Sequence, residues 1–395
     1  MRVISLILML SFSDNGIASS YKRLGKLYKD TQVHTIDNYP TIRTQDGVGI
    51  CYAVTVTQLL NYQYCKQNKL NCKEAKNQIS LLDVTAYSEY YAKTISEGGY
   101  PHSLLRSLKQ QTDSIFKEQC LPFELLSHKD GEKDKAQGQG YKSLREIYDK
   151  HPRYLSPEEQ MCHAKTIKSI LSIEKDIEAI LNAFQATSVA QFVYEVAVKD
   201  ECLDEQQKIS LPDFHTGVYP SFGDQEEATP ESLLGKVEKL VLNDIPVGIS
   251  FCTNSSEDCG AHAVSINGIK EVCNKDDCRI MLKLHNSYGQ SWQNFYNGGW
   301  VDGENLMRSA LQYNKKNLLT WISEYKSEKD IPEKILKRSR PKKSSHNPTI
   351  AINTEESDTF PDGIDPKRSP VFKCDGNYFG GWKPNSNCKF MMYSR

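Results

Sequence analysis

The feature that most constrains the fold is a change in residue pattern past the middle of the chain. Up to residue 243, apolar residues recur mainly at helical spacing. After that point come four short β-prone runs separated by Gly, Asn and Asp, at residues 247–252, 263–269, 279–285 and 318–323. A helical part followed by a strand-rich part predicts an α+β fold of two packed subdomains.

Within the first part, five segments are expected to be helical: residues 51–66, 81–95, 103–110, 156–198 and 230–243. The lead-in at 21–44 is polar, residues 128–140 read as a charged surface loop, and residues 210–229 are rich in turn formers. From Lys337 the chain is rich in Lys, Arg, Ser and Pro, which predicts a solvated linker before a short tail with two cysteines.

Composition excludes some classes of function. The 395 residues carry a formal net charge of -1, so no strong field predicts nucleic acid or an anionic membrane as a partner. The hydrophobic fraction of 38% and the aromatic fraction of 10% are sufficient for a sizeable core.

The N-terminus has the pattern of an export signal. Met1 and Arg2 supply a positive charge, residues 3–12 are almost wholly apolar, and small residues at 18–20 offer a cleavage site. The run is too short to span a bilayer, and no later segment is long and apolar enough to do so. We expect a signal peptide at 1–20 and a secreted or otherwise exported protein, in an extracellular, periplasmic or lysosome-like compartment. The alternative is a buried N-terminal strand or helix.

Twelve cysteines agree with export. Close spacing predicts four disulfides: Cys65–Cys72, Cys252–Cys259, Cys273–Cys278 and Cys374–Cys388. Zinc ligation is disfavoured because no Cys-x-x-Cys occurs. If Cys51 stays free, eleven cysteines remain, and this odd number leaves one further free thiol or an intermolecular bond.

Cys51 has the surroundings of a nucleophile. It follows Gly47 and Gly49 and opens a predicted helix, where unpaired backbone N–H groups and the helix dipole favour a thiolate. Gln45, six residues upstream, offers a side-chain N–H to a developing oxyanion, and the backbone N–H of Cys51 offers a second donor.

A base and a residue to orient it are expected on two neighbouring strands. His262 lies among small residues at the start of one strand run, and Asn286 ends the next run. A hairpin closed by Cys273–Cys278 would bring these two side chains together. Trp292 is expected to shield their hydrogen bond from water.

These motifs resemble those of the papain family of cysteine peptidases. The family-like segments occur in family order from Gln45 to about Tyr325: a nucleophile motif at 45–53, a Gly-Gly segment at 97–101, an aromatic-bounded proline at 122–123, an entry to the second subdomain at 245–247, a histidine motif at 262–264 and an asparagine motif at 286–292. The resemblance implies a two-subdomain fold with a helical left half, a β-barrel-like right half and an active-site cleft between them.

The resemblance also implies a function. It implies hydrolysis of peptide bonds by an endopeptidase with Cys51, His262, Asn286 and Gln45 as catalytic residues and a thioester acyl-enzyme. It needs no metal or organic cofactor, and its partners are protein or peptide substrates and a protein inhibitor in the cleft. The substrate-binding residues it implies are Gly98, Gly99, Tyr100, Pro101, Ala261 and Trp292, whose apolar wall predicts a preference for Leu, Val, Phe or Tyr two residues before the cleaved bond.

Some positions depart from the family pattern. Val48 and Ser96 stand where the family has a disulfide, and Tyr288 stands where it has tryptophan. Because few residues precede Gln45, we expect no long inhibitory pro-region of the kind common in the family. We expect a peptidase domain at 21–325 with an insertion at about 125–229, followed by a linker and tail at 326–395.

Two other functions remain open from the sequence. An acyltransferase or transamidase would use the same Cys-His-Asn chemistry with an amine in place of water. A peptide-binding protein could keep the scaffold without catalysis. The sequence gives no oligomeric state.

Overall fold

The computed structural model describes residues 29–45, 48–88, 98–126, 139–202, 208–224, 226–253, 259–274 and 278–336, and three short strands of the tail. The expected signal peptide at 1–20 and the basic run from Lys337 lie outside the described residues. Among the described helices, none combines the length and the apolar character needed to cross a membrane.

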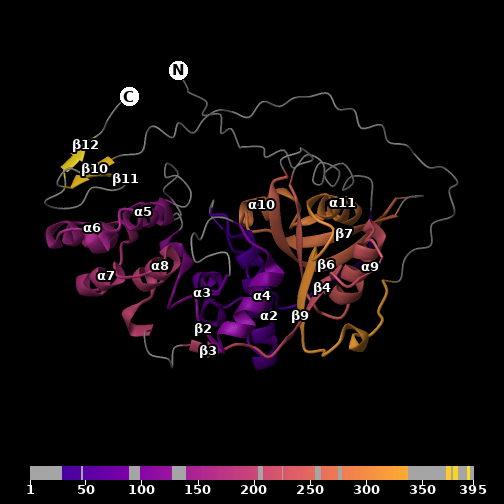
Figure 1. Cartoon of the computed structure of the whole chain (residues 1–395). Helices are drawn as coiled ribbons and strands as arrows, with labels where there is room; N and C mark the ends of the chain where they lie inside the picture. The colour runs from indigo at the N-terminus through magenta and orange to yellow at the C-terminus, as the bar shows by residue number, and fades with distance from the viewer. Residues whose placement is uncertain are drawn as a thin grey trace, which may run out of the picture.

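Helix α2 (Cys51–Asn68) lies between the other helices and the sheet (Figure 1). It is buried on nearly every side, which is the pattern of a core helix and not of a surface helix. Its last turn ends at Lys69, whose left-handed backbone (φ 53°) lets its N–H bond to the carbonyls of Cys65 and Lys66. Helices α3 (Leu81–Ala86) and α4 (Pro101–Gln111) pack against it.

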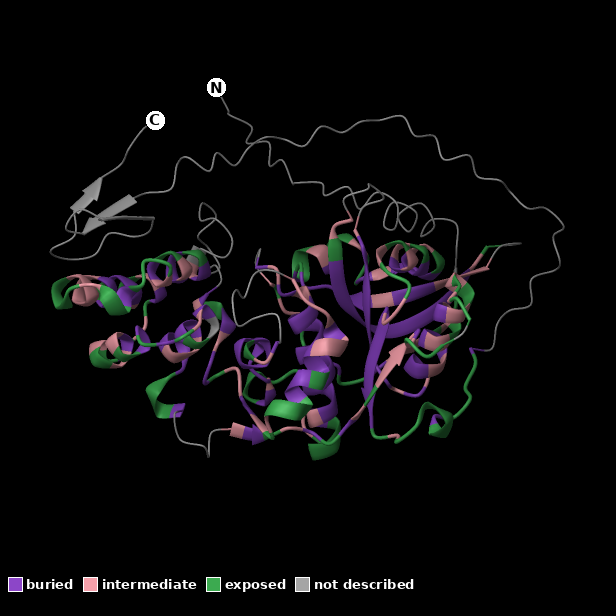
Figure 2. Ribbon diagram, in the orientation of Figure 1, coloured by how far each residue is buried: buried purple, intermediate pink, exposed green. Residues whose placement is uncertain are grey.

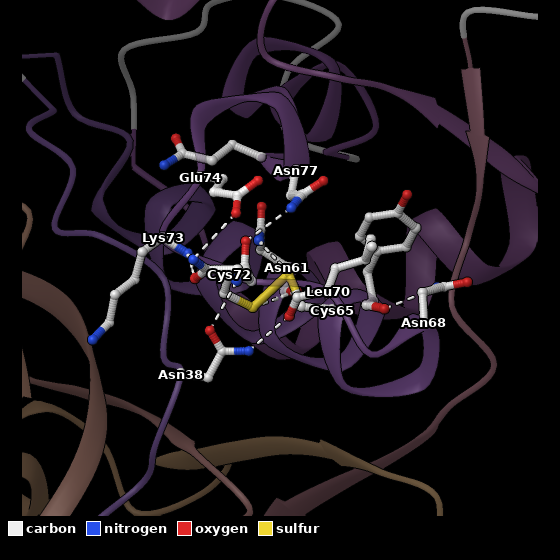
Figure 3. The surroundings of a disulfide bond; sticks show 12 residues. Asn38, Asn61, Cys65, Asn68, Leu70, Cys72, Lys73, Glu74 and Asn77 are labelled. Carbon is white, nitrogen blue, oxygen red and sulfur yellow. Dashed lines mark hydrogen bonds between the residues drawn. A yellow bond between two sulfur atoms is a disulfide. The ribbon is translucent and has the colours of Figure 1, made fainter.

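The Cys65–Cys72 disulfide closes the loop after α2, and asparagine side chains surround it (Figure 3). Asn38 of the lead-in donates from Nδ2 to the Leu70 carbonyl at 2.7 Å and accepts the Cys72 N–H on Oδ1 at 2.9 Å. Asn61 of α2 accepts the Ile79 N–H at 2.7 Å. The two Asn38 bonds hold the segment that leads to Gln45 on the helical half.

The strand-rich half is one antiparallel sheet of seven strands. Its order is β4 (His215–Tyr219), β9 (Leu319–Ser323), β5 (Val247–Cys252), β6 (Ala261–Cys273), β7 (Cys278–His285) and β8 (Trp300–Asp302). β6 is long: its first half pairs with β5, and its second half pairs with β1 (Lys29–Thr35). Its pairing with β7 shifts register between Ile266 and Gly268. The described strands form an open sheet with β4 and β8 at its edges, so the barrel-like closure is not confirmed.

Helices cover both faces of this sheet. α9 (Pro230–Val241) and α11 (Gly303–Tyr313) pack on one face, and α2 packs on the other against β5, β6 and β9. Every residue of β5 is therefore buried, and the centre of the sheet is buried throughout in Figure 2. This explains why residues 247–252 read as a continuous apolar run and not as an alternating one.

The expected insertion contains four separate helices: α5 (Gln139–Tyr148), α6 (Pro157–Leu171), α7 (Ile177–Ala183) and α8 (Val189–Ala197). The segment 156–198, predicted to be helical, is divided into three of these helices. It breaks at Ser172, which has a left-handed backbone, and new helices start at the capping residues Asp176 and Ser188. The four helices lie beside α3, on the side away from the sheet (Figure 1).

The remaining elements are short. A two-stranded sheet of β2 (Ser114–Phe116) and β3 (Lys208–Ser210) joins the two ends of the insertion. Helix α10 (Gln290–Phe295) follows β7. Single 3-10 turns occur at Ala75–Asn77, Phe123–Leu125, Pro152–Tyr154, Asp200–Cys202 and Glu328–Asp330, and the tail forms β10 (Val371–Cys374), β11 (Asn377–Gly380) and β12 (Lys389–Met391).

Three of the expected disulfides are confirmed: Cys65–Cys72, Cys252–Cys259 and Cys273–Cys278. Cys388 lies outside the described residues, so Cys374–Cys388 stays a prediction. A fourth bond, Cys120–Cys202, was not predicted because 82 positions separate its cysteines in the sequence. It closes the base of the insertion beside the β2–β3 pair.

We predict that the Cys120–Cys202 bond contributes more to stability than the Cys273–Cys278 bond. Loop-closure entropy for a separation of 82 amounts to about 4.5 kcal/mol. The same estimate for a separation of 5 amounts to about 2 kcal/mol. Urea unfolding of the C120S/C202S variant, with C273S/C278S as the matched control, measures the two losses. An equal or smaller loss in C120S/C202S would contradict the prediction.

Candidate active site

Cys51 is the first residue of α2, and it is the cysteine that the described part of the chain leaves free. Its side chain is half-buried. Burial raises the pKa of the thiol, and the backbone amides of Ala263, Tyr52 and Cys51 itself act in the opposite direction. The contact with Ala263 brings the thiol of the helical half against the strand that carries His262.

His262 in β6 and Asn286 after β7 meet as expected. Nε2 of His262 lies 2.9 Å from Oδ1 of Asn286, and both residues are buried. The same Oδ1 accepts the backbone N–H of Tyr288 at 3.1 Å, which fixes the orientation of the amide. Because an amide oxygen only accepts, Nε2 must donate, and Nδ1 of the neutral ring is then the acceptor.

Aromatic rings enclose the imidazole on two sides. The ring of Tyr288 stacks on His262 with centroids 4.4 Å apart and planes 12° apart. Phe251 of β5 meets it edge-on at 5.7 Å. Tyr288 therefore covers one face of the His262 ring. Trp292 packs on Tyr296 with centroids 4.4 Å apart and lies outside the described residues that line the cavity, and its shielding of the His262–Asn286 bond stays a prediction.

Both reactive groups favour their neutral forms. Burial lowers the pKa of His262 to about 4, although its hydrogen bond to Asn286 acts in the opposite direction. The sequence predicted a thiolate from the helix N-terminus, but desolvation outweighs the amides and the pKa of Cys51 is raised. At neutral pH the resting site therefore holds a thiol beside a neutral imidazole.

Residues of both halves line a cavity of about 310 Å³. Its lining contains the expected Gly98, Gly99, Tyr100 and Ala261 together with Cys51 and His262. It also contains three residues that the sequence reasoning missed: Ser250 of β5, Ala263 of β6 and Tyr313 at the end of α11. The expected Pro101 is buried as the first residue of α4 and lies outside the described lining residues.

Gly98 and Gly99 line this cavity, and each position favours glycine for a different reason. Gly98 has a left-handed backbone (φ 77°), which side chains disfavour. At Gly99, a Cβ atom would lie 2.9 Å from ring carbons of Tyr52, the residue after Cys51. The absence of a side chain at Gly99 therefore allows this backbone to lie close to the start of α2.

Gln45 lies outside the described residues that line the cavity, but it is held beside Asn286. Its backbone N–H donates to the Ser287 carbonyl at 2.8 Å, and the buried Ser287 hydroxyl donates to its Oε1. The amide oxygen is thus used as an acceptor, and the amide nitrogen is the donor that can serve an oxyanion. Ser287 was not predicted from the sequence. It reaches Gln45 because Thr44 pairs with Tyr288, and these residues are far apart in the chain.

Glu271, Cys273 and Cys278 have ligand atoms within 4.8 Å of one another. The two cysteines form a disulfide, so their sulfurs are not thiolate ligands. This cluster, which lies at the far end of the β6–β7 hairpin from His262, is not suited to hold a metal in the oxidised protein.

Comparisons with known proteins show a likeness to solved structures alone, and the one described here is weak. No protein-family model matches the chain, and no curated protein matches it. Among solved structures, the chain is similar to proCathepsin B S9 from Trypanosoma congolense at a TM-score of 0.36 and 13% identity, over 81% of this chain and 80% of that chain. A likeness at this level does not define a family.

The lowered pKa of His262 predicts a specific pH dependence for any reaction in which it removes the Cys51 proton. The imidazole accepts a proton only when neutral, so reactivity should hold at pH 6 and fall as the pH drops through about 4. The measurement is the rate of Cys51 carboxamidomethylation by iodoacetamide between pH 3 and 7, followed by peptide mass spectrometry. A fall centred near pH 6.5, the ordinary value for histidine, would contradict the burial argument.

Proposed function

We propose that the protein is a papain-like cysteine peptidase that hydrolyses peptide bonds through Cys51, His262, Asn286 and Gln45. One observation carries the proposal: a free thiol at a helix N-terminus lines the same cavity as an imidazole whose other nitrogen is bound to a buried amide. This is the arrangement that thiol acyl transfer requires.

In the proposed mechanism, Nδ1 of His262 takes the thiol proton as Sγ of Cys51 attacks the peptide carbonyl carbon. The oxyanion that forms is held by the Gln45 amide and the backbone N–H of Cys51. The C–N bond then breaks, and His262 returns its proton to the leaving amine. A thioester remains on Cys51.

Water completes the cycle. His262 accepts a proton from the attacking water, and collapse of the second tetrahedral intermediate breaks the C–S bond. The carboxylic acid leaves and the proton returns to Cys51. Asn286 keeps Nε2 protonated throughout, so that Nδ1 always faces the reacting atoms.

The cavity suggests how a substrate is held. We infer that an extended peptide pairs with the backbone of Gly98 and Gly99, and that the side chain two residues before the cleaved bond enters the cavity. Tyr100 and Tyr313, whose rings are 6.4 Å apart, and Ala261 would contact it. These surfaces favour apolar side chains. The disulfides support an extracellular or lysosomal location for this activity.

We predict that C51A and H262A abolish peptide hydrolysis. C51A removes the nucleophile and H262A removes the base, whereas Q45A should lower kcat by roughly 10²–10³ because one oxyanion donor is lost. The measurement is mass spectrometry of a denatured protein substrate incubated with each variant. S80A, which removes the cap of α3 outside the cavity, is the control for handling and folding. Full hydrolysis by C51A would exclude the mechanism.

A second prediction concerns the cavity. Peptides with Leu, Val, Phe or Tyr two residues before the cleaved bond should be cleaved best, since burying such a side chain contributes about 1.5–3 kcal/mol. Y313A should shift the preference from Val toward Phe, because it removes one wall of the cavity. Y154A, a change at an exposed tyrosine of the insertion, is the matched control. A fluorogenic library varied at this position makes the measurement, and equal cleavage with Arg or Asp there would contradict it.

A further inference from the structure

We propose that Arg43 is a positioning residue for Gln45, acting through an ion pair with Glu118 on the helical half. This inference rests on the proposed function, because it assigns Arg43 a part in holding the oxyanion donor. Arg43 lies two residues before Gln45, in the lead-in that crosses from the sheet to the helices.

Arg43 binds two separate acceptors. Its Nη1 donates to Oε2 of Glu118 at 3.0 Å, and its Nη2 donates to Oε1 of Gln78 at 2.9 Å. The Arg43 side chain is only 11% exposed and that of Glu118 21%, so solvent screens this pair less than a surface pair. A guanidinium can reach both acceptors at once, whereas a lysine ammonium offers no such planar fork.

The acceptors are themselves fixed. Glu118 accepts the backbone N–H of Leu81 at 3.0 Å and that of Phe123 at 2.8 Å, which ties it to the start of α3 and to the turn after β2. Gln78 receives Arg43 on its oxygen and donates from its nitrogen to Thr41 Oγ1 at 2.7 Å. Thr41 and Arg43 are therefore held at two points on a rigid part of the helical half.

The other side of the same segment is held by the sheet half. Thr44 bridges to Tyr288, and Gln45 bonds to Ser287 through its backbone and its side chain. Residues 43–45 thus span the two halves, with Arg43 as the anchor on one side and the Asn286–Tyr288 segment as the anchor on the other. Without the Arg43 contacts, Gln45 is held only by its bonds to the sheet half, and its amide can shift. A displacement of about 1 Å at a reacting group can lower the rate a hundredfold.

The test compares R43M and R43K with wild type. R43M should lower kcat for a fluorogenic peptide about tenfold with little change in KM, and R43K should lose less because it keeps one charged contact. Binding of acetyl-Phe-glycinal, an aldehyde whose thiohemiacetal oxygen occupies the oxyanion position, should weaken by the same factor. Alkylation of Cys51 by iodoacetamide forms no oxyanion, so we expect its rate to be unchanged in R43M. An unchanged rate would show that the site of the variant is still folded.

A double-variant cycle separates positioning from general stability. In the Q45A background, R43M should cause no further loss, because the group that it positions is already absent. R145M, which removes a surface ion pair of the insertion, should leave all three measurements at their wild-type values. The inference would be overturned if R43M lowered kcat equally with and without Gln45, or if R43M kept the wild-type kcat. In either case the results for Q45A and C51A would still test the peptidase function separately. Absence of hydrolysis by wild type would instead reject the proposed function.

Discussion

The packing of α2 against β6 is the contact on which the candidate site depends. Because α2 is buried on nearly all sides, its first turn cannot shift without disturbing the core of the helical half. This fixes Cys51 against the amide of Ala263, one residue from His262, although the two halves come from distant parts of the chain. The thiol and the imidazole are thus brought together by core packing and not by a flexible loop.

The β6–β7 hairpin adds the second constraint. Its register pairs Ser265 with His285 and so places Asn286 opposite Val264, two residues from His262 along β6, while the Cys273–Cys278 bond closes the opposite end. The turn after Asn286 then does three things within consecutive residues: Asn286 orients the imidazole, Ser287 holds Gln45, and Tyr288 covers the ring. One short segment therefore couples the base, the expected oxyanion donor and their shielding.

Features encoded by neighbouring residues could be predicted from the sequence. The start of α2, the strands at 247–252 and 279–285, and the Cys273–Cys278 hairpin follow from local periodicity and turn residues, and the structure agrees. Features set by long-range contacts could not. The Cys120–Cys202 bond, Tyr313 at the cavity and the stacking of Tyr288 on His262 depend on how distant elements pack, and no local pattern specifies that.

The protonation states of Cys51 and His262 also depend on long-range contacts that a local sequence pattern does not show. A helix N-terminus favours a thiolate, and this local effect was the one visible in the sequence. Tertiary burial raises the pKa of Cys51 and lowers that of His262, whose ring contacts Phe251 and Tyr288. In the proposed mechanism, the charge is therefore created during attack. Fixed donors such as the Cys51 amide have the most effect on charge that appears in such a low-dielectric site. Under the proposed mechanism, the position of Gln45 and the contacts that hold it from both halves therefore matter more than they would beside a preformed ion pair.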